Sequence, residues 1–406
     1  MRNESNLDGG SLLGVTSYGK LLFTVELGTF NALFKNTQLH NDDKVQAARQ
    51  NLCIPISQLK ALCIKADFPY PLLLVDPKYA REISDDYEKR IYAGTDRKTV
   101  SIACRDEVNL ADISLILRDV VHKQEVFNKI HKWNDCDIAG VLCRKEYSSL
   151  SMEEKVHALK DLVNYDTNVV MAKKNKREAF DYLVEALSNH HVYVSLYGRL
   201  SSPQSLPRSN FSGIAVNNKK CPFLFVKTNS DNQGADLWGR RIFTTVLLLL
   251  CLALKRNGPV AIGGFQNNSI DDDLYIMAEE FLMPQALLSD VIISSIGELI
   301  DMSNKYKVSP SAMVMRLARM NKISADDKGA MLDALEKDFN QSRGFKGSKS
   351  PERQRYELSY YSNRHYIRII SEAVLAGSIN RGVAESVVCG RKGKTEASSL
   401  DGWVDV

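Results

Sequence analysis

The stretch RRIFTTVLLLLCLALKR, residues 240–256, contains thirteen uncharged residues between two pairs of basic ones. A helix that spans a membrane needs roughly 20 consecutive apolar residues. The uncharged segment, residues 242–254, is too short for that and has charges close on both sides. It therefore predicts a helix that is buried in the core of a globular protein.

The composition of the chain fits a globular protein with a sizeable core. Hydrophobic residues make up 44% of its 406 residues and charged residues 25%, which are ordinary values, and the length favours two or three domains. The net charge of +4 is too small to indicate a nucleic-acid partner by itself. The N-terminus lacks the features of a secretory signal, so we expect a cytoplasmic protein whose eight cysteines are reduced.

Three short apolar segments precede the apolar helix and predict a small sheet. They are VYVSLYG (192–198), FSGIAV (211–216) and PFLFVKTN (222–229), and the turn NNKK joins the last two. Near the N-terminus, residues 21–34 predict one more strand followed by a short helix.

Helical periodicity dominates the rest of the chain. It extends over residues 107–131, 271–282 and 361–376, among others. Another helix is expected from Ser309, because serine suits an N-cap and Pro310 suits the first helical position. The sequence thus predicts an α+β fold that is mostly helical, with a small mixed or antiparallel sheet packed on the buried helix.

Changes in sequence character suggest four parts. We expect an N-terminal extension (1–41), a helical N-terminal domain (42–165), a domain that holds the sheet and the apolar helix (166–342), and a basic loop with a helical C-terminal extension (343–406).

The order of motifs resembles the ImmA/IrrE family of zinc metallopeptidase-like proteins. Strand, turn and strand are followed by R-x-F-T at the start of a helix, an acidic helix that ends in F-L-M-P, and V-S before a helix with R-L. The residues that carry the resemblance are Gly213, Pro222, Arg241, Ile242, Phe243, Thr244, Ala278, Phe281, Leu282, Met283, Pro284, Val308, Ser309, Arg316 and Leu317. It covers about residues 45–390 and implies that the apolar helix is zincin-like.

In that family, R-x-F-T is followed by an H-E-x-x-H helix, whose two histidines bind zinc and whose glutamate acts as general base. In register, these three positions are Leu247, Leu248 and Cys251 here. Leucine offers neither a metal ligand nor an exchangeable proton. The resemblance therefore implies a pseudo-peptidase that lacks catalytic residues and needs no metal or other cofactor.

An acidic cluster lies in the region that supplies the third zinc ligand in the family. Asp271, Asp272 and Asp273 have two interpretations. They are a remnant of the ligand set, or they form the start of a helix, where negative charge is stabilising. We favour the helix start.

Basic segments raise the alternative of a nucleic-acid-binding regulator. The largest is RGFKGSKSPERQR (343–355), in which Arg343, Lys346, Lys349, Arg353 and Arg355 are possible phosphate contacts. The segment VSPSAMVMRLARMNK also looks like part of a helix-turn-helix. Solvent-exposed loops and internal packing explain the same patterns.

A protein partner is the function that the resemblance favours. Family members belong to mobile elements, phage control, stress regulation and toxin–antitoxin modules, so we expect a regulator whose partner is encoded nearby. We place the partner along residues 222–238, with contacts to Phe223, Phe225, Lys227 and Trp238, on the hypothesis that residues 222–229 form an edge strand. Trp238 equally suits a core position at the helix start.

A metal-dependent hydrolase with unusual ligands is the other alternative to a protein-binding regulator. No membrane contact is expected, and the sequence does not indicate the oligomeric state.

Overall fold

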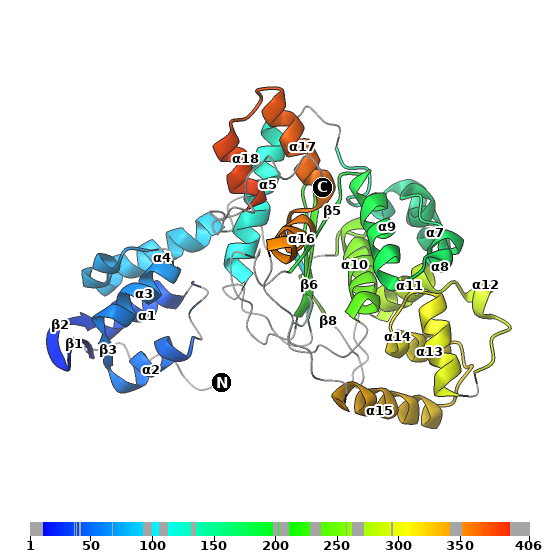
Figure 1. Ribbon diagram of the computed structural model, residues 1–406, viewed down its shortest axis with the longest axis horizontal. Coiled ribbons are helices and arrows are strands. Elements are labelled where there is room, and N and C mark those ends of the chain that lie inside the picture. Colours follow the sequence, from blue (N-terminus) through cyan, green and yellow to red (C-terminus); the bar gives the residue numbers. More distant parts are fainter. Residues whose placement is uncertain are drawn as a thin grey trace. The chain divides into compact units, whose positions relative to one another are not determined.

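The computed structural model describes residues 11–35, 37, 39, 42–66, 68–91, 100–104, 113–130, 135–197, 202, 211–227, 237–256, 258–261, 272–293, 295–341 and 351–389 (Figure 1). The chain divides into two compact units. The first comprises Met1–Asp96, Val108–Asp119 and Gln204–Ser209, and the second comprises Arg97–Glu107, Val120–Pro203 and Asn210–Val406.

The first unit contains a three-stranded sheet in the order β2-β1-β3. β1 (Leu12–Ser17) and β2 (Lys20–Glu26) are antiparallel, and β3 (Cys53–Pro55) joins β1 in parallel. Tyr18 and Gly19 connect β1 to β2 with φ values of 47° and 77°. Positive φ at both positions is what a two-residue type I′ hairpin turn requires.

Helices cover one face of this sheet. They are α1 (Leu27–Lys35), α2 (Asp43–Asn51), α3 (Ile56–Ala66), the 3-10 helix η1 (Tyr70–Leu74) and α4 (Pro77–Ile91). Leu13 and Val15 of β1 alternate toward the helices and are fully buried together with Phe30 and Phe34 of α1. The core of the first unit therefore lies between the helices and one side of the sheet.

The second unit contains a five-stranded mixed sheet in the order β5-β7-β6-β4-β8. Its strands are β4 (Val100–Cys104), β5 (Tyr193–Leu196), β6 (Phe211–Val216), β7 (Phe223–Val226) and β8 (Gly258–Ala261). β6 pairs antiparallel with both β4 and β7, whereas β5–β7 and β4–β8 are parallel pairs.

The second unit also contains helices, which occur in the following order along the chain. They are α5 (Ser114–Ile130, whose first turns belong to the first unit), η4 (Val141–Cys143), α6 (Lys145–Ser148), α7 (Met152–Leu162), α8 (Thr167–Ala172), α9 (Lys176–Ser188), α10 (Leu237–Ala253), α11 (Asp272–Leu282), α12 (Gln285–Leu288), α13 (Ile296–Lys305), α14 (Pro310–Arg319), α15 (Ala325–Gln341), α16 (Pro351–Ser362), α17 (Arg364–Leu375) and α18 (Arg381–Val388).

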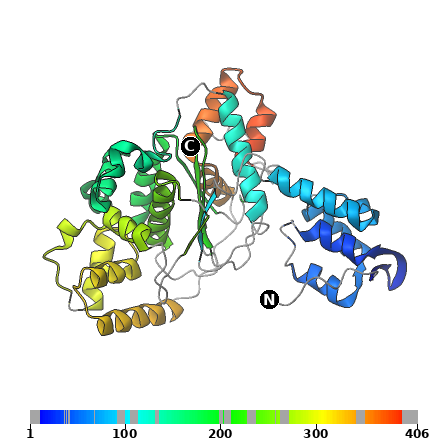
Figure 2. The same cartoon turned by 180° about the vertical axis from the view of Figure 1, so that it is seen from behind.

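Different helices cover the two faces of the five-stranded sheet (Figures 1 and 2). On one face, α10 contacts β4, β6 and β7. On the other, the ring of Tyr366 from α17 lies 5.4 Å from that of Tyr193 and 5.5 Å from that of Phe223, measured between ring centroids. Phe127 of α5 packs on Tyr193 at 5.7 Å on this side. The sheet is thus the middle layer between two layers of helices.

The expected α+β class is confirmed, because the chain is mostly helical with a small mixed sheet. The strands expected at 192–198, 211–216 and 222–229 are present as β5, β6 and β7. β4 and β8, which pair with each other and extend this sheet, were not expected. No described helix is long and apolar enough to cross a membrane.

The expected four-part division remains a prediction. Residues 12–26, assigned to an N-terminal extension, share one sheet with β3 and one core with α2 and α3. Residues 135–165, assigned to the N-terminal domain, belong to the second unit.

Candidate functional site

The helix α10 contains most of the uncharged segment 242–254. Residues 246–253 are each at most 2% exposed. Leu247, Leu248 and Cys251, the three positions that the resemblance aligns with H-E-x-x-H, are 1%, 0% and 1% exposed. The expectation that the apolar stretch is a core helix is therefore confirmed.

Contacts on several sides explain why α10 carries no charge in its last turns. It contacts α9 and α11 as well as the strands β4, β6 and β7. An amphipathic surface helix buries one stripe, but a helix enclosed in this way has apolar residues all round. The run VLLLLCLA at 246–253 is what such an environment requires.

The helix lies very close to the sheet at Gly213 of β6. A Cβ atom at residue 213 would lie 2.8 Å from Cδ1 of Leu248, 2.7 Å from the carbonyl oxygen of Phe225 and 3.2 Å from Cγ2 of Thr244. Real Cβ atoms do not come so close to other atoms. Gly213 therefore makes the space that Leu248 fills, which gives a packing reason for a glycine in the middle of a strand.

The start of α10 is fixed by stacking around Trp238. The ring of Trp238 lies 5.5 Å from that of Phe180 on α9 and 6.0 Å from that of Tyr360 on α16. The guanidinium carbon of Arg241 lies 4.1 Å from the centroid of the Trp238 ring. Trp238 is half-buried against the main core. These contacts favour its interpretation as a residue that packs the helix start, rather than an exposed anchor for a partner.

Metal-ligating side chains do not gather at this helix. Across the described part of the chain, no group of three or more His, Cys, Asp or Glu side chains has the geometry to hold a metal ion. Cys251 lies on α10 between leucines, and the positions one turn before it, Leu247 and Leu248, have no ligand atoms. Of these three described positions, only Cys251 offers an atom that could ligate a metal.

The acidic cluster lies at the start of α11. Asp272 is the first residue of this helix and Asp273 is exposed, whereas Asp271 lies outside the described residues. Carboxylates in the first helical turn interact favourably with the positive end of the helix dipole. Among the described residues, the position of the cluster agrees with a helix start.

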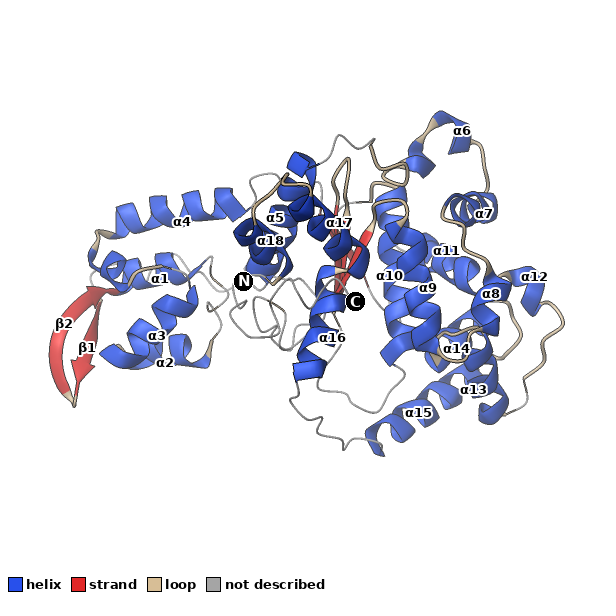
Figure 3. Ribbon diagram, turned by 45° about the horizontal axis from the view of Figure 1, so that its top comes forward, coloured by secondary structure: helices blue, strands red, loops and turns tan. Residues whose placement is uncertain are grey.

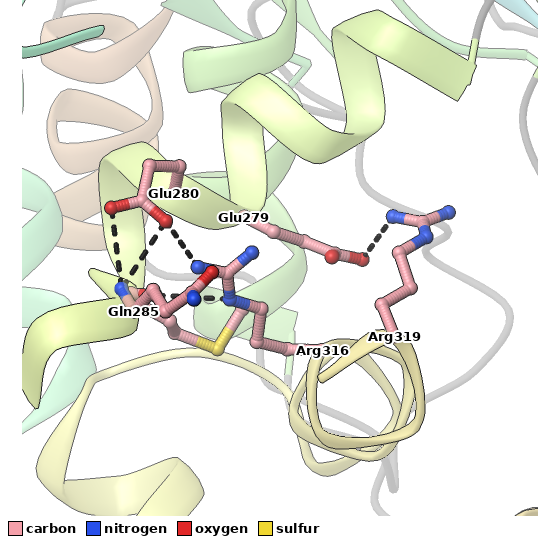
Figure 4. Close-up of polar contacts among 6 residues, drawn as sticks. Glu279, Glu280, Gln285, Arg316 and Arg319 are labelled. Atoms are coloured by element: carbon pink, nitrogen blue, oxygen red, sulfur yellow. Dashed lines mark hydrogen bonds and ion pairs between the residues drawn. The ribbon is translucent and has the colours of Figure 1, made fainter. Parts of the chain in front are cut away.

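Two buried glutamates farther along α11 form ion pairs with arginines of α14 (Figure 4). Arg316 of α14 donates a hydrogen bond from Nη2 to Oε2 of Glu280. Its Nε donates to the carbonyl oxygen of Met283 at 3.1 Å. The backbone N–H of Gln285 donates to both oxygens of Glu280 at 3.2 Å. The side chains of Arg316 and Glu280 are only 5% and 9% exposed.

A second ion pair joins the same two helices. Nη1 of Arg319 lies 2.7 Å from Oε1 of Glu279, whose side chain is 2% exposed. Arg316 and Arg319 are three residues apart and so share one face of α14, while the two glutamates are adjacent on α11. We call these four residues the α11–α14 ion cluster.

The buried Lys160 of α7 extends the cluster. Its Nζ donates to Oγ1 of Thr167 at 2.6 Å and lies 5.7 Å from the ring centroids of Tyr165 and Phe281. Burial lowers the pKa of Lys160, and the negative charge of Glu280 opposes that change in part. A cation here is therefore stabilised by Glu280 and by aromatic faces.

The role of the α11–α14 ion cluster is to fix the turn after α11. Glu280 satisfies the N–H of Gln285, which begins α12, and Arg316 satisfies the carbonyl of Met283. The motif in the sequence includes Arg316, but Glu279 and Glu280 were not expected to have a role. The available signal was a pair of adjacent glutamates in the apolar second half of α11, together with two arginines at helical spacing.

The expectation of an edge strand at 222–229 is wrong. β7 lies between β5 and β6 and is hydrogen-bonded on both sides. Phe223 and Phe225 are 0% and 1% exposed, so neither side chain reaches a partner in this structure. Lys227 follows β7 and is half-buried, and its N–H donates to the carbonyl oxygen of Ser212 at 2.8 Å. A partner strand cannot add to the sheet at this place.

The side chains that were expected to contact phosphates are not described in this structure. Arg343, Lys346 and Lys349 lie outside the described residues, and the side chains of Arg353 and Arg355 are likewise not described. The segment that looked like a helix-turn-helix is α14, whose two arginines pair with the glutamates of α11.

Comparison with known proteins returned no matching family model, no matching curated protein and no matching solved structure.

Proposed function

We propose that this chain is a degenerate ImmA/IrrE-like protein that retains the scaffold of the peptidase domain without its chemistry and acts by binding another protein. The observation that carries this proposal is the full burial of Leu247, Leu248 and Cys251 on a helix that packs on a mixed sheet. The order of sheet, buried helix, acidic helix and α14 supports the resemblance, since each motif falls on the expected element.

The chemistry of the three positions supports a loss of catalysis. A zinc peptidase uses two nitrogen ligands on one helical face, a carboxylate base beside them, and an open coordination position for water. At these positions the chain has two side chains without lone pairs and one thiol, all packed against neighbours. One thiol does not make a catalytic zinc site.

A protein partner follows from the same resemblance. Proteins of this kind act in mobile elements, phage control and toxin–antitoxin modules, where partners are encoded side by side. The partner surface proposed here is on the second unit but excludes the buried strand β7. We also propose that the protein is cytoplasmic.

Peptide hydrolysis tests the loss of catalysis. The purified full chain is assayed on casein and on a mixture of unstructured peptides, with added zinc, without it and after chelator treatment. We expect no hydrolysis in any condition and substoichiometric zinc in the purified protein. Hydrolysis that zinc supports and the chelator abolishes would favour the metal-dependent hydrolase instead.

Co-expression tests the binding function. The full chain is produced together with the product of each adjacent gene, and the mixtures are separated by size-exclusion chromatography. We expect one adjacent product to elute in a stoichiometric complex with the chain. The Glu280→Gln variant disturbs the α11–α14 ion cluster. Whether it still elutes with the partner shows whether binding requires an intact second unit. If every neighbouring product elutes separately, the proposed partner class is wrong.

A further inference from the structure

Lys307 lies on the turn that joins α13 to α14 and is only 7% exposed. Its φ value of 59° is in the left-handed region, which glycine adopts without steric cost and lysine does not. Its backbone N–H donates to the carbonyl oxygen of Asn304 at 3.4 Å. Lysines are rarely buried to this extent unless their charge has a partner. The groups around its ammonium group therefore indicate what this lysine can bind.

The ammonium group of Lys307 has no hydrogen bond or ion pair with a residue in the described part of the chain. Burial has the largest effect on this group and lowers the pKa of Lys307. The positive charge of Lys176 lowers this pKa further, and the negative charge of Glu178 raises it by a smaller amount. Repulsion between the two lysines thus exceeds the attraction by Glu178, and the balance favours a bound anion.

The start of α9 adds positive charge at the same place. Lys176 is the first residue of this helix, which has thirteen residues, and its charge acts on Lys307. Figures 1 and 3 both show α13 and α14 on the same side of the five-stranded sheet as α9. The N-terminal end of a helix attracts anions, because its dipole is positive there and its first N–H groups point outward.

The carboxylate of Glu178 is engaged in the cap of α9. One of its oxygens accepts from the backbone N–H of Lys174 at 3.2 Å, and the other accepts from Nδ2 of Asn175 at 3.3 Å. Asn175 is the N-cap, and its Oδ1 accepts from the N–H of Glu178 at 2.9 Å. These contacts hold the carboxylate at the capping turn, so it is not available to bind the ammonium group of Lys307 as well.

We propose that a phosphate group binds at the start of α9, between the ammonium groups of Lys307 and Lys176. A phosphate group carries a charge of about −1.5 to −2 near pH 7 and has several acceptor oxygens, so it can accept from two lysines at once. Lysine binds phosphate as a point charge, and helix N-termini bind it through N–H groups. This site is independent of the function proposed for α10, because it uses none of the residues that carry that proposal.

Isothermal titration calorimetry of the full chain with inorganic phosphate tests the proposal. The titration is done at constant ionic strength, adjusted with sodium chloride, so that a change in screening does not imitate binding. We expect saturable binding with one phosphate per chain. An unaltered chain that phosphate does not saturate overturns the proposal.

Three variants locate the bound anion. Lys307→Gly removes the ammonium group and suits the left-handed backbone, and we expect the dissociation constant of phosphate to rise roughly tenfold or more. Lys176→Gln should raise it by a comparable factor. Lys255→Gly is the matched control, since Lys255 also has a positive φ, 48°, but is exposed. Its dissociation constant should equal that of the unaltered chain.

Circular dichroism and urea unfolding without phosphate check that each variant folds. A Lys307→Gly variant that folds and binds phosphate as tightly as Lys255→Gly contradicts the proposal, because the anion then binds elsewhere. Phenyl phosphate, titrated in the same way, distinguishes the two sources of the group. Binding at least as tight as that of inorganic phosphate indicates a phosphate ester as the ligand, and weaker binding indicates the free anion.

Discussion

Gly213 of β6 and Leu248 of α10 lie so close together that a Cβ atom at residue 213 would stand 2.8 Å from Cδ1 of Leu248. The same Cβ would also meet the carbonyl oxygen of Phe225, which belongs to the inner strand β7 and cannot move without disturbing the sheet. This contact joins α10 to the five-stranded sheet of the second unit.

Gly213→Ala should destabilise the protein for this reason. Overpacking a close contact costs about 1–3 kcal/mol, and here both the helix and the strand have to shift. The free energy of unfolding from urea titration measures the effect. Gly329→Ala on α15 is the matched control, because a Cβ there meets nothing within 4 Å and alanine favours a helix by about 0.5–1 kcal/mol. Equal effects of the two substitutions would show that the helix does not press on the sheet at residue 213.

Arg316→Met should be among the most destabilising single substitutions of a charged residue. It leaves the carboxylate of Glu280 buried without its cation, and breaking a buried ion pair in this way costs about 3–5 kcal/mol. Arg381→Met is the control, since Arg381 and Glu385 form an ion pair whose side chains are 51% and 41% exposed. An exposed pair of this kind contributes about 0.2–1 kcal/mol.

The double variant Glu280→Gln/Arg316→Met separates charge from packing. Removing both charges also removes the unpaired carboxylate, so we expect a smaller loss than for Arg316→Met alone. Losses that simply add in the double variant would contradict a direct coupling between the two side chains.

Cys136 gives a pH dependence whose sign follows from its burial. Burial raises the pKa of the Cys136 thiol from 9.0 to about 11, although hydrogen bonds from backbone groups oppose the shift in part. Above the unfolded pKa, the unfolded chain loses this proton while the folded chain keeps it. The stabilisation that comes from keeping this proton is therefore fully present below about pH 9. It is lost as the pH rises to about 11, which lowers the free energy of unfolding by about 2–3 kcal/mol.

Cys136→Ala should make the loss of stability over that pH window less steep, because it removes one of several buried thiols whose pKa is raised. Denaturant unfolding between pH 8 and 11 measures the slope. Cys53→Ala, at an exposed thiol, should keep the slope of the unaltered chain. If Cys136→Ala keeps it too, the thiol is not buried in the way that the structure shows.

Local signals in the sequence predicted much of the fold. Ser309 caps α14 by accepting a hydrogen bond from the N–H of Ala312, and Pro310 is its first residue, as expected. The burial of α10 followed from the length of its uncharged run. In both cases a few neighbouring residues determine the outcome, so one sequence contains enough information.

Features that depend on distant segments were not predicted. β4 is short, and its partners β6 and β8 begin more than a hundred residues later in the chain. The apolar pattern of β7 is the same for an inner and an edge strand. The strand order, and with it the position of the expected partner strand, could therefore not be predicted from residues 222–229. The α11–α14 ion cluster likewise depends on how two helices meet.

The central claim of the proposed function is that α10 corresponds to the zinc-binding helix of ImmA/IrrE proteins, with core residues in place of the metal-binding face. The stability of Leu248→Glu tests this claim most directly. The substitution puts back the acidic residue of the family motif at a side chain that is 0% exposed. Leu375→Glu, at an 83% exposed leucine on α17, is the control and should cost about 1 kcal/mol or less. For Leu248→Glu we predict a loss of several kcal/mol in the free energy of unfolding, because a carboxylate is buried there without a partner. A Leu248→Glu variant as stable as the control would contradict the claim and indicate an open cleft at this face of α10.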